Sequence, residues 1–159
     1  QFYQLSAFIL SKFLTDFTEE ELLEYTRQAY AEEKWGEDPV PLVQLNEYNE
    51  REFMLELWHG PTCAFKDVAL QLLPHLMTAA AKKTGLTKKI CILTATSGDT
   101  GKAALEGFKD LPGTEIIVFY PTGGVSEAQK LQDHILDLYL DRCYSGFPLS
   151  VVFILCTDR

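Results

Sequence analysis

The sequence predicts an α/β fold in which a partial parallel sheet is flanked by helices. The main observation lies at residues 88–121, where an apolar strand (KKICILTAT), a polar loop (SGDTG), a helix (KAALEGFK) and a second apolar strand (EIIVFYP) follow one another. A strand, a helix and a strand at this spacing form a βαβ unit, whose strands are parallel and joined by a right-handed crossover. Both strands are continuous apolar runs, which is typical of strands buried on both faces.

Residues 1–40 are expected to be helical. Thr18 followed by Glu21 fits a capping box, and the acidic residues there suit the positive end of a helix better than a metal site. Gly36 and Pro39 are expected to end the helix that begins after Thr18. Its apolar stripe would consist of Leu22, Tyr25, Ala29 and Tyr30.

Residues 41–58 read as two short strands separated by a polar stretch. In the second run, FMLELW, alternate residues beginning with Phe53 would form one buried face. A helix is then expected from about Lys66 to Lys83, and Pro74 should kink or split it. The last residues of the chain, RCYSGFPLSVVFILCTDR, read as a turn and one apolar strand.

Composition narrows the class of protein. The 159 residues are enough for one domain with a core, and the formal net charge of -9 argues against a nucleic-acid surface. Four cysteines without a CxxC motif indicate neither a zinc site nor a disulfide framework, so we expect free thiols in the cytoplasm. No apolar run is long enough for a membrane span, and a secretory signal is a weak reading of the start of the chain.

Lys66 is the first candidate for chemistry, because it follows a strand and stands where an apolar helix begins. The positive end of a helix disfavours an ammonium and therefore favours the neutral amine that reacts with carbonyl groups. The ordinary alternative is an exposed lysine that pairs with Asp67 or Glu56. From spacing alone, that alternative is favoured. His59, at the strand end, is a weaker candidate and reads better as a structural residue.

The loop from Thr96 to Gly101 is the second candidate. A glycine-bearing loop between a parallel strand and a helix is where open α/β sheets bind anions, here through loop N–H groups and nearby hydroxyls. The alternative is an ordinary helix start with Ser97 or Asp99 as the capping residue, and with Gly98 and Gly101 as turn residues. The loop is neither a P-loop nor GxGxxG, and Ser97 lacks the GxSxG context of a hydrolase.

Three blocks taken together resemble the threonine synthase family: ELWHGPTCAFKDVALQLLPHL, ILTATSGDTGKAALEGF and GTEIIVFYPTGGVSEAQKLQ. They occur in the family's order and cover roughly residues 10–132. The resemblance implies an incomplete version of a two-domain PLP-enzyme fold, with a helical region at 1–40, an α/β segment at 41–132 and a divergent tail at 133–159.

The same resemblance implies a pyridoxal 5'-phosphate (PLP) enzyme that converts O-phospho-L-homoserine and water into L-threonine and phosphate. Lys66 would be the catalytic residue, because it binds the cofactor covalently and moves protons at the substrate's α and β carbons. Phe65 and Asp67 would flank and position the lysine, and Asp99 would lie near the cofactor. The substrate carboxylate would be held by Thr96, Ser97, Gly98 and Thr100.

The sequence departs from the family pattern in two ways. The beginning of the family's N-terminal region is expected to be missing, and the pattern is expected to stop near Gln132. The glycine-rich loop for the cofactor phosphate belongs to the family's later portion, so it is not found. We therefore expect a fragment, or a truncated or frame-shifted product, that is inactive alone. The alternative is a non-catalytic regulatory or secreted interaction protein, and a phospho-lyase or a threonine/serine dehydratase is a lesser option. The expected partners are a small amino-acid phosphate and, through an open strand edge, other copies of the chain, but neither nucleic acid nor membrane.

Overall fold

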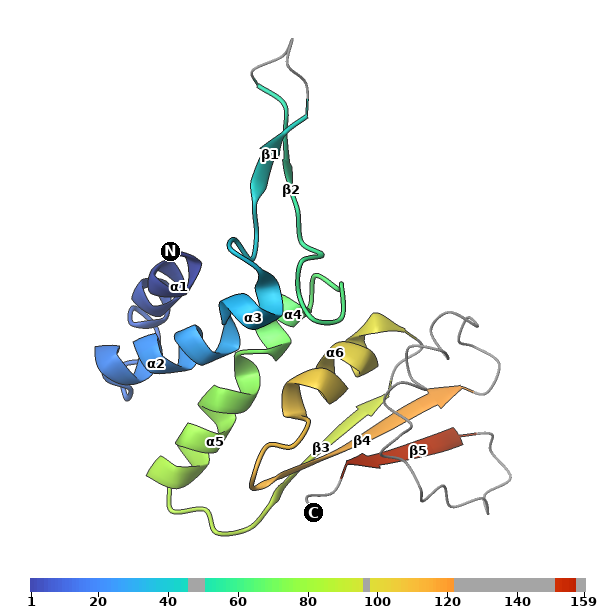
Figure 1. The fold of residues 1–159 in the computed structure, drawn as a ribbon. Helices are drawn as coiled ribbons and strands as arrows, with labels where there is room; N and C mark the ends of the chain where they lie inside the picture. The colour runs from blue at the N-terminus through green and yellow to red at the C-terminus, as the bar shows by residue number, and fades with distance from the viewer. Residues whose placement is uncertain (46–50, 96–97, 122–150, 157–159) are drawn as a thin grey trace. The chain divides into compact units, whose positions relative to one another are not determined.

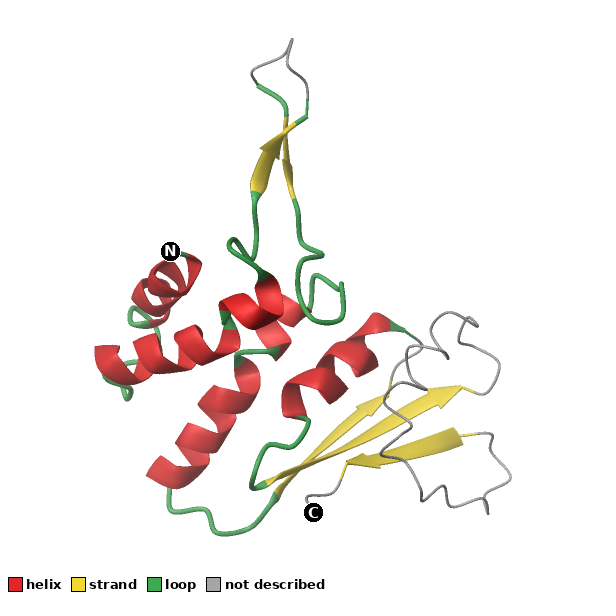
Figure 2. Cartoon of the chain, viewed as in Figure 1, coloured by secondary structure: helices red, strands yellow, loops and turns green. Residues whose placement is uncertain are grey.

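A computed structural model describes residues 1–45, 51–95, 98–121 and 151–156 of the chain. These residues fall into two compact units, Gln1–Leu76 and Met77–Arg159. Helices occur together with a small parallel sheet, so the predicted α/β class is confirmed (Figure 2). Figure 1 labels the elements in chain order.

The first unit begins with three helices, α1 (Phe2–Leu10), α2 (Glu19–Ala29) and α3 (Glu32–Trp35). The predicted capping box of α2 is confirmed. The Thr18 hydroxyl accepts a hydrogen bond from the Glu21 N–H at 3.2 Å, and the Glu21 carboxylate accepts one from the Thr18 N–H at 2.9 Å. Two backbone donors that a helix start would leave unpaired are thereby satisfied.

Helix α2 ends earlier than predicted. Tyr30 leaves the helical conformation with φ −113° and ψ 37°, and the separate helix α3 ends at Gly36, whose φ is 78°. The indole N–H of Trp35 donates to the Ala29 carbonyl at 2.9 Å. This bond satisfies a carbonyl that an uninterrupted helix would have used, and it turns Trp35 into the core.

The core of this unit combines aromatic and aliphatic side chains from helices that are distant in the sequence. Phe2 and Tyr30 meet edge to face at 4.8 Å between ring centroids, and Tyr30 and Trp35 do so at 5.8 Å. Such pairs add directional contacts to the burial of apolar surface. The buried members of the cluster are Ala29, Tyr30, Trp35 and Leu72, and the partly buried ones around them include Leu10, Tyr25, Val68 and Leu76.

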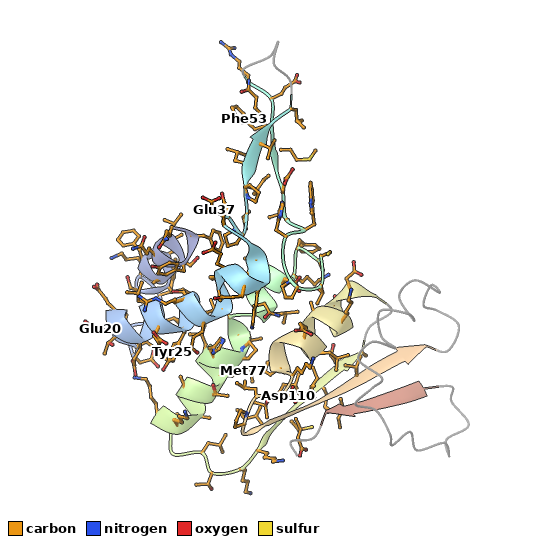
Figure 3. All side chains as sticks on the ribbon, in the orientation of Figure 1. Glu20, Tyr25, Glu37, Phe53, Met77 and Asp110 are labelled. Carbon is orange, nitrogen blue, oxygen red and sulfur yellow. The ribbon has the colours of Figure 1, made fainter. Side chains whose placement is uncertain are left out.

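Strands β1 (Leu42–Gln44) and β2 (Phe53–Leu55) form an antiparallel hairpin, as Figure 3 shows around the labelled Phe53. The expected buried face is wrong. Phe53 is 50% exposed, Met54 41% and Leu55 52%, so both faces of the hairpin are open. Within the first unit the hairpin extends away from the helices (Figure 1), and a two-stranded ribbon has no layer of its own to pack on.

The helix expected from Lys66 to Lys83 is divided in two, as Pro74 predicted. Helix α4 (Asp67–Leu70) ends before the proline, and α5 (Leu73–Lys83) contains it in its first turn. A proline has no N–H to continue the hydrogen bonding of α4, whereas the first turn of a helix does not need that donor.

The second unit contains a sheet in the order β3–β4–β5, with strands β3 (Ile90–Ala95), β4 (Thr114–Pro121) and β5 (Val151–Cys156). Strands β3 and β4 are parallel, and α6 (Asp99–Phe108) connects them, so the predicted βαβ unit is confirmed. The apolar strand expected near the end of the chain is β5, which pairs antiparallel with β4.

One face of the parallel pair is covered by α6 (Figure 1). The side chains of Ile116 and Val118 on β4 are buried, as are Leu105 and Phe108 on α6. Strand β3 was expected to be buried on both faces, and this is wrong, because Leu93 is 66% exposed. Burial along β3 alternates residue by residue, which is the pattern of a strand with one covered face.

Candidate active-site segments

Residues 59–66, which lead from the hairpin into α4, form a tight loop whose side chains point alternately inward and outward. Thr62, Ala64 and, at the start of α4, Asp67 are buried, whereas Cys63 and Phe65 are exposed. Cys63 adopts a left-handed φ of 58°, which is uncommon for a residue other than glycine. The loop is closed by a hydrogen bond of 3.0 Å from the Cys63 N–H to the Gly60 carbonyl.

The carboxylate of Asp67 is the buried centre of this loop, with 0% of the residue exposed. One oxygen, Oδ2, accepts from the Thr62 N–H at 2.8 Å, and Oδ1 accepts from the Thr62 hydroxyl at 2.7 Å. Burial of a carboxylate is unfavourable unless hydrogen bonds replace its water, and Thr62 supplies two of them. The sequence did not single out Thr62, because nothing in its spacing showed that Asp67 turns inward.

Gly60 lies against this carboxylate. A Cβ atom at Gly60 would stand 2.5 Å from Asp67 Oδ2 and 2.9 Å from Cη2 of Trp35. Such distances are shorter than non-bonded atoms allow, so the position has room only for glycine. The lysine-bearing loop therefore rests directly on the core of the helical region through Trp35.

Lys66 is the residue immediately before α4, and its side chain is partly buried. Its Nζ lies 4.6 Å from the centroid of the exposed Phe65 ring, so these two predicted site residues are neighbours. The two carboxylates considered as ion-pair partners are engaged elsewhere: Asp67 accepts from Thr62, and Glu56 Oε2 lies 2.5 Å from His59 Nε2. The amine thus contacts an aromatic face in a cation–π arrangement, and it pairs with neither of these two carboxylates.

The electrostatic argument for Lys66 is weaker than expected from the sequence. The helix that follows it, α4, has four residues instead of a continuous run to Lys83. A short helix sums few peptide dipoles, so its positive end has little effect on the amine. Lys66 therefore remains a candidate because of its contacts rather than because of a helix dipole.

His59 belongs to the end of the hairpin and not to the lysine. Its imidazole pairs with Glu56 and stacks on the Trp58 ring at 5.9 Å between centroids. Both side chains of the His59–Glu56 pair are partly buried. These contacts agree with the reading of His59 as a structural residue.

The second candidate segment lies at the start of α6, in the other unit. Gly98 is the residue before the helix, Asp99 is its exposed first residue, and Thr100 is partly buried. Thr96 and Ser97 lie outside the described residues. Asp99 is therefore in the first turn, and the alternative that made it the capping residue is wrong. The first N–H groups of a helix are donors suited to an anion.

Metal-ligand clusters and membrane-spanning helices are both absent from the part of the chain that the structure describes. There, no three His, Cys, Asp or Glu side chains are grouped as metal ligands would be. No helix in the described ranges combines the length and apolar character that a bilayer crossing requires. Cys63 and Cys91 are exposed free thiols.

Comparison with known proteins finds threonine synthases from several organisms. The threonine synthase of Pseudomonas aeruginosa is 47% identical over 93 residues, which are 58% of this chain and 19% of that protein. The threonine synthase of Corynebacterium glutamicum is 34% identical over 155 residues, 97% of this chain and 31% of that protein. That alignment extends past Gln132, the residue at which the sequence pattern was expected to stop. No profile of a known protein family matches the sequence.

The fold is similar to that of a solved relative. The crystal structure of a PLP-bound threonine synthase from Brucella melitensis matches with a TM-score of 0.70 and 39% identity, over 82% of this chain and 27% of that one. The chain thus spans about a fifth to a third of the length of the relatives that it matches.

Proposed function

Because this chain is related to threonine synthases over part of their length, we propose that it carries the lysine-bearing part of a PLP-dependent enzyme that makes L-threonine and phosphate from O-phospho-L-homoserine and water. The observation that carries the proposal is the set of contacts around the Lys66 amine. Its amine lies against an exposed aromatic ring, and both nearby carboxylates are engaged by other residues.

The residues around Lys66 fit such a cofactor. A primary amine that is partly buried and contacts no carboxylate among the described residues is suited to bind an aldehyde, and the Phe65 face suits a flat ring. When bound, PLP supplies the electron sink that stabilises negative charge at the substrate's α carbon. Lys66 would hold the cofactor and then carry protons to and from the α and β carbons of the substrate.

The start of α6 supports the proposed binding of the substrate carboxylate. The N–H groups of Gly98 and Thr100, with the Thr100 hydroxyl, are donors at the positive end of a ten-residue helix. Thr96 and Ser97 are assigned to the same carboxylate by resemblance, and Asp99 is assigned to the cofactor. The exposed position of Asp99 leaves its carboxylate available for that contact.

The experiment that tests the proposal is covalent trapping. The chain is incubated with PLP, reduced with borohydride, and mapped by peptide mass spectrometry, with Lys66→Arg as the control. We expect label at Lys66 at PLP concentrations that leave other lysines, such as Lys82 and Lys83, unlabelled. Equal labelling of all lysines would contradict a cofactor site, and threonine formation from phosphohomoserine by the chain alone would contradict the expected inactivity.

We further propose the cytoplasm as the compartment and a small amino-acid phosphate as the ligand. The exposed free thiols of Cys63 and Cys91 support a reducing compartment. Self-association is proposed as well, since apolar side chains on the hairpin and on β3 are open to solvent.

A further inference from the structure

The buried carboxylate of Asp67 has a cost that its contacts must offset. An apolar residue would fill a closed core site without losing hydration, whereas the carboxylate of Asp67 needs hydrogen bonds to offset its burial. Asp67 uses one oxygen for the Thr62 N–H and the other for the Thr62 hydroxyl, so it binds a single residue at two points. Two bonds to one residue fix an orientation as well as a distance.

The position of this anchor determines the path of the loop. Asp67 holds Thr62 five residues earlier in the chain, and its own N–H donates to the Ala64 carbonyl at 2.9 Å. The residues between them must make a complete turn, which is where Cys63 takes its left-handed φ. Gly60 lets the carboxylate approach the preceding backbone. The backbone on both sides of Lys66 is therefore held by one carboxylate.

This arrangement has a direct consequence for the amine. Because Asp67 points inward to Thr62, its neighbour Lys66 points away from it, and Nζ lies over the Phe65 ring instead of pairing with the adjacent acid. Without the Thr62 contact, the carboxylate of residue 67 would be free to turn toward the adjacent ammonium. An ion pair there would withdraw the amine from a carbonyl compound.

We propose that Asp67 is a positioning residue that acts through Thr62 to keep the Lys66 amine over Phe65 and free of ion pairs. The catalytic meaning of this role rests on the proposed function, whereas the geometry it asserts can be tested without any cofactor.

The test is an NMR measurement of the Lys66 amine. Reductive methylation with isotope-labelled formaldehyde gives each lysine a methyl signal and keeps its positive charge. The Lys66 signal, assigned by its loss in Lys66→Arg, is expected upfield of the Lys82 signal, because methyl groups over a ring face are shielded. Lys12, whose amine lies 4.4 Å from the centroid of the Phe8 ring, should be shielded as well and serves as a positive control. Phe65→Leu should abolish the shift.

The anchor variants decide the proposal. Asp67→Asn removes the acceptor for one Thr62 donor, so the loop that orients Lys66 is no longer held at two points, and we expect the upfield shift of Lys66 to be lost. Thr62→Val keeps the carboxylate and can therefore also form the ion pair with Lys66. Thr62→Val should lose part of the shift, Thr62→Ser should retain it, and the exposed Asp16→Asn should leave it unchanged. If circular dichroism shows that Asp67→Asn does not fold, the proposal is tested by the Thr62 variants alone. A loss of shift in Thr62→Val and its retention in Thr62→Ser would then support the positioning role.

A purely structural role would lower thermal stability without moving the Lys66 signal. A folded Asp67→Asn or Thr62→Val protein that keeps the full shift would overturn the proposal, and so would a wild-type Lys66 signal that coincides with the Lys82 signal. Trapping with PLP and borohydride forms the second arm, where we expect selective labelling of Lys66 to fall about tenfold in Asp67→Asn. If PLP labels the lysines of the wild type without selectivity, the proposed function is refuted. The positioning role of Asp67 is still supported in that case, provided that the NMR shifts are as expected.

Discussion

At the scale of single residues, Asp67 shows what the sequence of the lysine loop could and could not predict. The resemblance placed Lys66 and Phe65 together, and the structure has the amine over the ring. The ion pair left open between Lys66 and Asp67 is wrong, because Asp67 turns inward to Thr62. That direction depends on the left-handed turn at Cys63, which no residue preference signals in advance.

Gly60 provides a prediction about close packing. Gly60→Ala would place a Cβ 2.6 Å from Asp67 Cβ and 2.9 Å from Trp35, so the loop or the core must shift. We expect a loss of about 1–3 kcal/mol in the free energy of unfolding, the usual range for an overpacked core, measured by denaturant titration.

The control for this variant is Gly85→Ala. Gly85 has a φ of 70°, and a methyl group added there would meet nothing within 4 Å, so its substitution is expected to cost about 1–2 kcal/mol from backbone strain alone. The NMR signal of Lys66 should move in Gly60→Ala and stay in Gly85→Ala. An unchanged signal and unchanged stability in Gly60→Ala would show that the loop is not packed as described.

Tyr30 provides a prediction about pH. Its hydroxyl donates to the Val68 carbonyl at 2.7 Å, and burial raises the pKa of Tyr30 from 10.0 to about 12. The folded state therefore keeps a proton that the unfolded chain loses first. The stability from this group is fully present below pH 10 and is lost as the pH rises toward 12, by roughly 3 kcal/mol.

The measurement is the free energy of unfolding of the wild type and Tyr30→Phe across that pH range. At neutral pH the variant should be less stable by about 1 kcal/mol, the net value of one hydrogen bond. We expect the difference to shrink and reverse as the pH rises, because phenylalanine cannot ionise. A difference that stays constant with pH would contradict the burial of the hydroxyl.

At the scale of elements, predictions that rest on local chemistry are confirmed. The capping box of α2, the division at Pro74 and the βαβ unit each follow from a few neighbouring residues. Predictions of what covers a strand are wrong for β2 and β3, whose apolar side chains are exposed. Alternation and apolar runs show which face is fit for burial, but only the packing of other elements decides whether the face is covered.

The α2 cap offers a test at this scale. Thr18→Ala removes the acceptor for the Glu21 N–H and should lower the free energy of unfolding by about 1 kcal/mol. Thr18→Ser keeps a hydroxyl at this position and should keep most of that stabilisation. Thermal unfolding followed by circular dichroism measures both. Equal losses in the two variants would mean that the hydroxyl does not cap the helix.

At the scale of the whole chain, two properties oppose each other. The net charge of -9 keeps copies apart, whereas the exposed apolar side chains favour association. The open apolar residues occur on separate elements, including α1, the hairpin and β3, with Phe8 at 61% and Leu93 at 66% exposure. The class of fold was predictable because it depends on the order of elements. The extent of open surface was not, since it depends on which elements pack together.

The balance between these properties predicts a dependence on ionic strength. At about 0.01 M salt the charges act over about 30 Å, and at about 1 M over about 3 Å, so repulsion between copies falls while apolar attraction remains. We expect sedimentation velocity to show a monomer at low salt and larger species at high salt. Leu55→Lys should suppress the larger species, because it removes a 52% exposed leucine from the hairpin. Gln44→Lys on the paired strand changes the net charge equally but removes no apolar side chain, so it should not suppress the larger species. If the two variants behave equally, the hairpin is not the associating surface.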